Sequence, residues 1–600
     1  MKTEHLKRII KRPLLWLCGV LPPLLWVGVG GGLVSCADFL EVKQLDQIIL
    51  EDFWTEKSDV DDVVTGCYVA LQSSGVRERM MVWGEVRSDN IAAGENIDNN
   101  ASLNNVVREN ITAMNAYTTW DGFYNVINRC NTVLKYAQIV ADADPSYTQG
   151  DLKATIAEVT ALRCLSYFYL IRTFRNVPYS TVAFTDDDQV MDLPATPFND
   201  VLDSLITDLE RVKGDAVTRY PETEPREQTG RITRDAIHAM LCEMYLWKQD
   251  YDNCIKYAEM VIDSKKQLFE EEVNRSNNIT PNTAQVLLQR CNGYPLQNDA
   301  LTGTTFGSAY EKLFIEGNTD GYARETIFEI VYDNHPKTSG QTANSAVSYL
   351  YGNGKTPKGV LIASSIITED IDKESNRTVY EDDNRKVDSR MYTNCKADGG
   401  NITKMATSMQ IIDASKPAEP TSMAAYFDED DNGSNWIIYR LSDIMLLEAE
   451  ALCQKMREGS DDDAMEYNTP LLDKAFTLVN AINKRSICKP IITASDSLQR
   501  TKYNTKATME KLVERERQRE LMFEGKRYYD LVRYCLRDGN TDQMLSAIAN
   551  RDNVNVAYAQ NFFKKMDAIF WPYNYEEMRV NRNLVPNPAF GTGENESYTK

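Results

Sequence analysis

Apolar side chains recur at three- and four-residue spacing along several stretches of the chain, a period typical of amphipathic helices. Residues 117–140 show it clearly, with Trp120, Phe123, Ile127 and Leu134 on one helical face. The same period predicts helices over residues 58–72, 151–174, 199–213 and 231–247. Ser58 and the acids after it are typical of a helix start, and Pro178 ends the segment of residues 151–174.

Residues 231–262 look like two short antiparallel helices joined by a polar turn at residues 249–251. Small residues, Ala236, Ala239 and Ala258, stand where the two helices would cross, which lets their backbones approach. This arrangement resembles a tetratricopeptide unit. Further helices are predicted at residues 437–455, 470–486 and 507–537, separated from the first set along the chain.

The middle of the chain, residues 265–435, has a different pattern. It is rich in Asn, Thr, Ser and Gly, with isolated strand-like runs such as residues 325–333. Loops of this length inside a folded protein are usually functional or disordered. The loops carry scattered aromatic side chains, which favours ordered binding loops: Tyr294, Phe306, Tyr310, Tyr322, Tyr349 and Tyr351. We therefore expect a mostly α-helical protein of about four helix-pair repeats with an irregular loop and short-strand region at residues 265–435.

The first 36 residues have the pattern of an export signal. A basic start is followed by residues 13–34, which carry no charge, and then by Ser35 and Cys36. The end of this segment, residues 33–36, resembles the lipobox of bacterial lipoproteins, in which the cysteine is lipidated and becomes the first mature residue. A membrane-spanning helix is the alternative, but two prolines and three consecutive glycines interrupt the apolar run. We expect a signal peptide at 1–35, lipidation at Cys36 and a single domain over 36–600.

Composition narrows the chemistry further. The formal net charge of −22 disfavours binding to nucleic acid, whose phosphates an acidic surface repels. Three histidines in 600 residues leave few options for His-dependent catalysis or zinc binding. The twelve cysteines form no CxxC pair and sit mostly in apolar helical stretches, as small buried hydrophobes do. We therefore expect no metal, no cofactor and no enzyme activity.

Four short motifs invite a chemical interpretation, and in each the structural alternative is favoured. GNGKT at residues 352–356 lacks the earlier glycine of a phosphate-binding loop. The acidic turn at residues 428–435 lacks the final carboxylate of a calcium loop. Glu516 and Glu520 alternate with arginines, which favours ion pairs on a helix surface over a pair of catalytic acids. His238 lies among Ala, Met and Leu and is expected in the core.

Several segments together resemble one family, the SusD/RagB-type outer-membrane nutrient-binding lipoproteins of Bacteroidota. In chain order these are WGEVRSDN (83–90), WDGFYNVINRCN, ALRCLSYFYLIRTFRNVPY, RITRDAIHAMLCEMYLWKQDYDNCIKYAEMVI, IIYRLSDIMLLEAEAL (437–452), RERQRELMFEGKRYYDLVRY (515–534) and WPYNYEEMRVNRNLVPNPAF (571–590). Each motif alone is weak, but the ordered set behind a lipobox is specific. The middle segment, residues 265–435, matches the family poorly.

The resemblance implies a binding protein that covers a SusC-like TonB-dependent transporter and captures a glycan for import. It also implies that the helical face of residues 120–175 and 231–263 docks on that transporter. We expect loop aromatics and amides to hold the ligand, because sugar rings stack on aromatic rings and amides bond hydroxyl groups. The candidates are Tyr294, Tyr310, Tyr349, Tyr351, Asn96, Asn99 and Asn100. An oligopeptide ligand, a surface glycosidase and a periplasmic tetratricopeptide scaffold remain as alternatives.

Overall fold

The fold is described from a computed structural model of the chain. The described residues are 53–186, 188–275, 279–298, 309–315, 324–332, 343–352, 359–368, 379–380, 388–396, 399–410, 422–425, 432–459, 461–489, 491–549 and 551–590. Those from Trp54 onward belong to one compact unit. The predicted signal segment and Cys36 lie outside the described residues, as do Phe306 and Tyr322.

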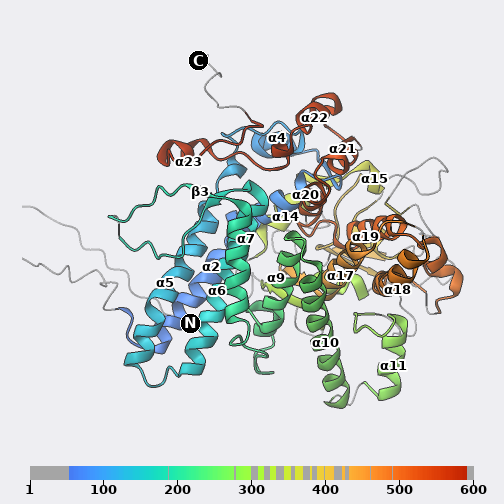
Figure 1. Cartoon of the computed structure of the whole chain (residues 1–600), viewed down its shortest axis with the longest axis horizontal. Helices are drawn as coiled ribbons and strands as arrows, with labels where there is room; N and C mark the ends of the chain where they lie inside the picture. Colours follow the sequence, from blue (N-terminus) through green and yellow to red (C-terminus); the bar gives the residue numbers. More distant parts are fainter. Residues whose placement is uncertain are drawn as a thin grey trace, which may run out of the picture. The chain divides into compact units, whose positions relative to one another are not determined.

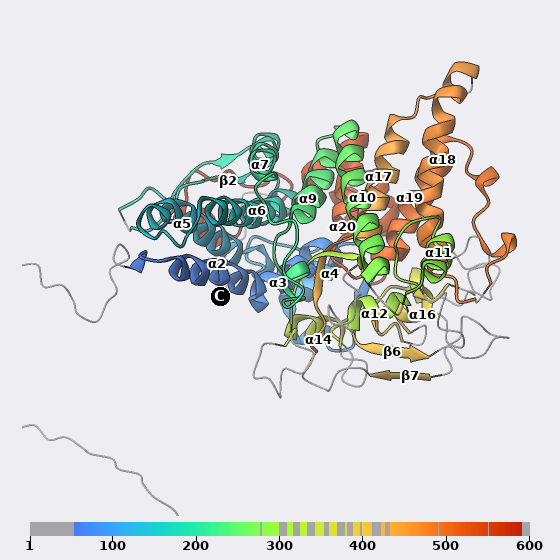
Figure 2. The ribbon, with the colours of Figure 1, turned by 90° about the horizontal axis from the view of Figure 1, so that it is seen from below.

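Antiparallel helices form the first part of the scaffold, and each packs against the next (Figures 1 and 2). They are α2 (Lys57–Gln72), α5 (Asp121–Ala143), α6 (Gln149–Phe174), α7 (Phe198–Val212), α9 (Arg234–Trp247) and α10 (Tyr251–Arg275). Side-chain caps begin α6, through the reciprocal capping of Thr148 and Asp151, and α9, through Thr233. These helices confirm the predicted segments, and His238 on α9 is buried as expected.

The late helices continue the same stack. α17 (Leu441–Lys455) packs on α9 and α10, and it is followed by α18 (Asp462–Arg485) and α19 (Lys506–Leu521). The row from α5 through α10 to α18 is visible in Figure 2. The last helices are α20 (Arg527–Asp538), α21 (Asp542–Ala549), α22 (Val556–Phe562) and α23 (Tyr575–Val580). The polar middle of the chain is therefore an insertion between two parts of one helical stack.

Short elements connect the long helices, and α12, α14, α16, β6 and β7 among them gather below the long helices in Figure 2. The helical ones are α3 (Ser74–Met81), the π-helix η2 (Val82–Val86), η3 (Ile97–Asn99), α4 (Ala101–Val107), η4 (Ala116–Thr118), α8 (Glu227–Gly230), α11 (Pro281–Arg290), α12 (Ala309–Ile315), α14 (Ser345–Tyr351), α15 (Ser365–Thr368), α16 (Arg390–Asn394), η8 (Ala494–Asp496), η9 (Arg500–Lys502) and η10 (Met566–Ile569). The described strands form two-stranded antiparallel pairs: β1 (Ile91–Ala93) with β5 (Leu361–Ala363), β2 (Val177–Pro178) with β3 (Ala195–Thr196), β4 (Thr326–Ile330) with β8 (Trp436–Arg440), and β6 (Thr407–Gln410) with β7 (Ser422–Ala425).

Three predicted boundaries are wrong. Residues 437–440 form a strand, because β8 pairs with β4 before α17 begins. The segment 507–537 is two helices, since Phe523 and Gly525 adopt positive φ angles that no α-helix accepts. The helix predicted from residue 470 begins at Asp462 and includes Pro470 in its interior.

Burial explains two features that composition alone left open. α6 is long and apolar enough to cross a membrane, but 89% of its apolar window is buried inside the protein, as in a core helix. The ten cysteines that the structure describes are all buried, and none of them forms a disulfide. Cys242 and Cys254 approach each other, with their sulfur atoms 3.7 Å apart. The apolar residues of α6 and the cysteines are therefore packed inside the protein, where a free cysteine behaves as a small apolar side chain.

Candidate functional site

Glu85, on η2, joins the motif of residues 83–90 to the motif of residues 515–534. Its buried carboxylate accepts hydrogen bonds from the backbone N–H groups of Phe523 (2.9 Å), Gly525 (3.0 Å) and Lys526 (3.2 Å). Asn90 donates a further bond of 2.8 Å. Burial raises the pKa of Glu85 to about 7, and the hydrogen bonds oppose this shift. The WGEVRSDN motif therefore closes the connection between α19 and α20.

Two glycines allow this close approach. A Cβ atom on Gly84 would lie 1.9 Å from the carbonyl oxygen of Gly525. Gly525 itself has a φ of +70°, which glycine adopts without strain. These motifs thus have a structural role, and the framework that they build positions β1 and the turn that follows it.

Two of the residues predicted for ligand binding meet beside that turn. Asn100 caps α4, with its side-chain oxygen accepting from the backbone N–H of Leu103 at 2.9 Å. Its amide nitrogen donates to the hydroxyl oxygens of Tyr349 (3.0 Å) and Tyr117 (3.1 Å). Tyr349 lies on α14 and is 41% exposed. An amide and a partly open aromatic ring are therefore held together from segments 249 residues apart.

Glu78, on α3, completes the cluster. The hydroxyl of Tyr117 donates to its carboxylate, and Tyr117 itself is buried. Burial and the nearby Glu78 charge both raise the pKa of Tyr117, so it stays a neutral donor. Within the described part of the chain, no acceptor takes the hydroxyl hydrogen of Tyr349, which leaves it free to donate to a ligand. We refer to Asn100, Tyr117, Glu78 and Tyr349 as the Asn100 cluster.

Asn96 and Asn99 lie on the turn just before Asn100, at and within η3. Both are exposed, and their side-chain amides make no hydrogen bond to another described residue. Amide groups presented in this way donate to and accept from hydroxyl groups. The turn and Tyr349 together offer an apolar ring face next to polar groups, which suits a neutral polyhydroxylated ligand.

The other three predicted tyrosines are buried, and this corrects their assignment as ligand contacts. Tyr294 is 6% exposed within the core formed by α17, α18 and α19. Tyr351 is 3% exposed and packs edge-on against Phe523. Tyr310 is 1% exposed, and its hydroxyl donates to the carbonyl oxygen of Glu520 at 2.7 Å. Their rings pack in the protein interior, where they anchor their own segments and leave no ring face open to a ligand.

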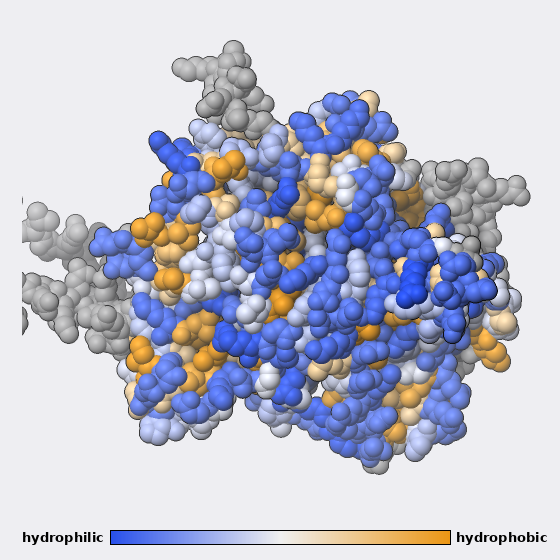
Figure 3. Space-filling view, in the orientation of Figure 1, coloured by the Kyte–Doolittle hydropathy of each residue, from blue (hydrophilic) through white to orange (hydrophobic). Residues whose placement is uncertain are grey.

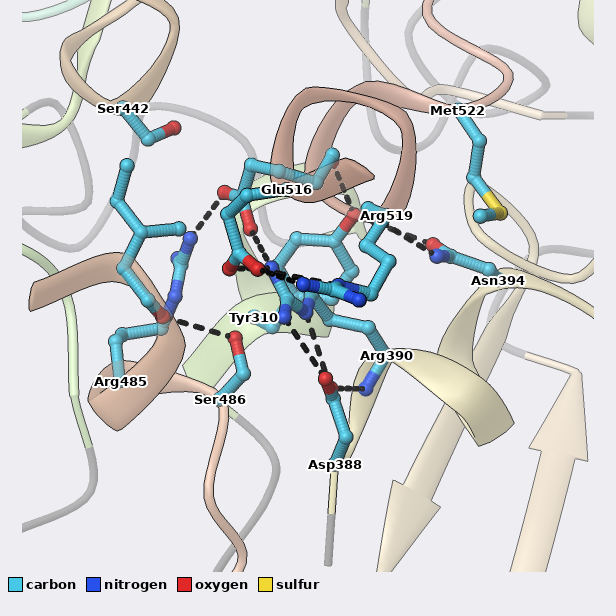
Figure 4. A network of polar contacts seen from close by, with 12 residues as sticks. Tyr310, Asp388, Arg390, Asn394, Ser442, Arg485, Ser486, Glu516, Arg519 and Met522 are labelled. Carbon is cyan, nitrogen blue, oxygen red and sulfur yellow. Dashed lines mark hydrogen bonds and ion pairs between the residues drawn. The ribbon is translucent and has the colours of Figure 1, made fainter. Parts of the chain in front are cut away.

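Tyr310 belongs to a buried ionic network, which is drawn in Figure 4. Glu516 accepts from Arg390 (2.8 Å) and Arg519 (2.7 Å), and Glu520 accepts from Arg390 (2.9 Å) as well as from Arg440 and Arg485. Every carboxylate and guanidinium of this set is at most 1% exposed. The expected ion pairs exist, but their placement on a helix surface is wrong. Carboxylates enclosed by arginines in this way cannot reach a substrate.

The described residues support neither a metal site nor a phosphate-binding loop. Among the described residues, no group of three or more His, Cys, Asp or Glu side chains could hold a metal ion. Most of the GNGKT segment and residues 428–431 of the acidic turn lie outside the described residues. The described remainder of that turn, residues 432–435, is buried and leads into β8.

Sequence reasoning missed Glu78 and Tyr117. Tyr117 follows an Asn-rich turn just before α5, and Glu78 stands in a helix of low hydropathy, so neither carries a pattern of its own. Their role depends on Asn100 and Tyr349, which only the folded chain brings together.

Comparisons with known proteins agree with this architecture. The sequence model described as "SusD family" matches residues 421–590, and the one described as "Starch-binding associating with outer membrane" matches residues 38–246. SusD-like protein P38 of Formosa agariphila is 24% identical over 93% of this chain and 95% of its own length. A SusD homolog from Bacteroides thetaiotaomicron superposes with a TM-score of 0.62 at 16% identity, covering 90% of this chain and 98% of that one. Surface glycan-binding protein A from the same species, solved with laminarihexaose, gives a TM-score of 0.56 at 18% identity, covering 89% of this chain and 100% of that one.

Proposed function

Since the chain belongs to the SusD family, we propose that it is a cell-surface lipoprotein that binds glycans and passes them to a SusC-like TonB-dependent transporter. The observation that carries glycan binding is the Asn100 cluster, which presents a partly open Tyr349 ring beside unoccupied amide groups. Structural relatives described as laminarin-binding or solved with laminarihexaose support the choice of ligand class.

The proposed ligand contacts are Tyr349, Asn100, Asn96 and Asn99. A sugar ring would stack on Tyr349, and its hydroxyl groups would bond to the phenol and to the amides of the turn. A stacked aromatic ring contributes about 1 kcal/mol beyond the area it buries. Burial of the apolar sugar face adds a comparable amount at about 25 cal/mol per Å². The hydroxyl of Tyr349 orients the ligand through a single hydrogen bond.

The test is a calorimetric titration with laminarihexaose, maltohexaose and other neutral hexasaccharides. We expect Tyr349→Ala to weaken binding of the recognised saccharide tenfold or more, and Tyr349→Phe to weaken it less. The matched control is Tyr467→Ala, because Tyr467 is a similarly exposed tyrosine (37%) on α18, outside this cluster. All three variants should melt close to wild type. Equal affinity of Tyr349→Ala and Tyr467→Ala would exclude the cluster as the site.

An oligopeptide ligand is the alternative, and a tryptic peptide mixture added to the same titration distinguishes it. Binding of peptides that Tyr349→Ala abolishes, without binding of any saccharide, would replace the glycan in this proposal. A surface glycosidase gains no support from the sequence's acid pair, since Glu516 and Glu520 are both sealed by arginines.

Anchoring and the transporter rest on the sequence and the family. We propose that Cys36 carries the lipid and that the face of residues 120–175 and 231–263 docks on the transporter. Labelled palmitate should enter the wild-type protein and not Cys36→Ala. Affinity-tagged protein purified from outer membranes should bring down a large barrel protein, and its absence would contradict the docking proposal.

A further inference from the structure

A groove of about 710 Å³ lies between α5, the segment of residues 178–193, and α23. It shares no lining residue with the Asn100 cluster. Its volume falls within the roughly 300–1,000 Å³ of known binding pockets. Trp120, Tyr124 and Phe184 contribute aromatic surface to its floor and walls. The groove is thus large enough for several side chains of a binding partner.

The amides of the groove hold its walls together. The side chain of Asn128 bonds both the backbone N–H (2.7 Å) and the carbonyl (2.9 Å) of Phe184. Asn581 donates to the carbonyl of Leu193 at 2.7 Å, and Tyr124 donates to that of Pro178 at 2.6 Å. These polar groups are therefore occupied, and they preorganise the groove instead of offering bonds to a hydroxylated ligand.

The mouth of the groove is apolar and open. Met191 and Val580 line it and are 54% and 74% exposed, and the neighbouring Val190 is 69% exposed. Figure 3 shows apolar side chains on the part of this face that Figure 1 assigns to α5, β3 and α23, at the upper left. Exposed apolar groups gathered around a cavity are typical of a surface that a partner covers.

The charge at the groove is negative. Asp121, Asp192 and Glu577 line it, and none of the described lining residues is Lys or Arg. Arg579, on the same helix as Glu577, is already paired with Glu576. Burial raises the pKa of Glu577, a hydrogen bond from the Trp120 side chain opposes this shift, and the nearby charge of Asp121 adds to it. A cation placed here would stabilise the ionised form of Glu577 against its burial and against the repulsion from Asp121.

We propose that this groove binds a protein segment that presents an apolar side chain flanked by Lys or Arg. The apolar group enters between Phe184, Met191 and Val580, and the cation reaches Asp121 and Glu577. An anionic ligand would meet uncompensated carboxylates, and a neutral sugar would find the amides already bonded. The groove overlaps the face proposed above to dock on a transporter only along residues 120–131 and at Tyr167. The inference rests on the groove's own lining and holds for any partner of this chemistry.

The test uses the full-length protein and a fluorescein-labelled hexapeptide in which leucine and lysine alternate, followed by anisotropy. Two comparison peptides replace lysine with glutamate or leucine with serine. We expect both comparison peptides to bind at least tenfold more weakly, and binding of the first to weaken with salt. The double variants Asp121→Asn with Glu577→Gln, and Met191→Ser with Val580→Ser, should each reduce affinity tenfold.

The matched control is Asp62→Asn with Val69→Ser, which removes one exposed acid and one exposed apolar residue from α2. It should bind like wild type, and melting curves check that every variant is folded. No binding of the leucine–lysine peptide at 1 mM, or equal loss in the control, would overturn the proposal. Displacement of the peptide by laminarihexaose would overturn it in favour of a saccharide. The peptide assay contains no transporter, so a lack of peptide binding does not bear on the pull-down that tests the transporter proposal.

Discussion

Replacing Glu520 by glutamine tests whether the buried ionic network stabilises the fold. Glu520 is fully buried and accepts from three arginines, Arg390 of α16, Arg440 at the end of β8 and Arg485 at the end of α18. Burial alone would raise the pKa of Glu520, but Arg485, Arg440 and Arg390 outweigh it and hold this pKa well below its usual value. The carboxylate therefore remains ionised in the folded protein.

Loss of this charge removes the carboxylate that the three guanidinium groups share. Arg390 then keeps Asp388 and Glu516, while Arg440 and Arg485 are left to share Glu325, with Glu524 also paired to Arg440. Removing one partner of a buried ion pair costs about 3–5 kcal/mol, because the remaining charge is uncompensated. A typical protein has about 5–15 kcal/mol of stability in total. We therefore expect Glu520→Gln to lose at least about 3 kcal/mol in urea unfolding followed by circular dichroism.

The control is Glu458→Gln, the same substitution in an exposed ion pair with Lys506, where Glu458 is 83% exposed. Exposed pairs are worth about 0–1 kcal/mol. The pH dependence of the free energy of unfolding gives a second test. Since the folded pKa of Glu520 lies below the unfolded value of 4.5, its stabilisation is present above pH 4.5 and is lost as the pH falls below it. A Glu520→Gln protein as stable as Glu458→Gln would refute the argument.

Two further changes probe the scaffold. Gly84→Ala should lower the free energy of unfolding in urea by about 3 kcal/mol or more, because its Cβ would overlap the Gly525 carbonyl. The control Gly214→Ala has open space around it and should cost less than about 1 kcal/mol. Equal costs would contradict the close approach of Gly84 to Gly525. Burial first, and then Arg234 and Lys213, lower the pKa of His238 to about 4 from 6.5, so its contribution to stability is lost as the pH falls from 6.5 to 4. Wild type should therefore lose up to about 3 kcal/mol more than His238→Gln over this range, and parallel pH profiles would show that His238 does not titrate there.

The helical stack could be predicted from the sequence because each helix has one apolar face. The errors arose where a distant segment decides the local structure. Residues 437–440 continue the pattern of α17, yet they pair with β4 from the inserted middle. The break after α19 depends on Glu85, which lies more than 430 residues earlier and holds the backbone of Phe523 and Gly525.

The candidate site could be predicted only in part. Tyr349 and Tyr351 both stand in a region of polar sequence. Because they are two residues apart on the helix α14, their side chains lie on nearly opposite faces, and Tyr349 is partly exposed while Tyr351 is buried. Tyr310 lies in an apolar run with Leu313 and Phe314, and this pattern could have identified it as a core residue of a short helix. The arginine-rich helix α19 gives no such signal, since its partners come from α16, β8 and α18.

The motifs that identify the family are therefore distinct from the residues proposed to bind the ligand. Glu85 and Glu520 are buried in the motifs of residues 83–90 and 515–534, where they join the two parts of the helical stack and the inserted middle. Asn100 and Tyr349 are partly exposed, lie outside those motifs and meet because the buried framework places β1 beside β5 and α3 beside α14. We therefore expect substitutions at the proposed site, in the turn of residues 96–100 or on the open face of α14, to change ligand binding without disturbing the framework. The family motifs indicate the scaffold, and the ligand has to be argued from the inserted segment and the turn that it meets.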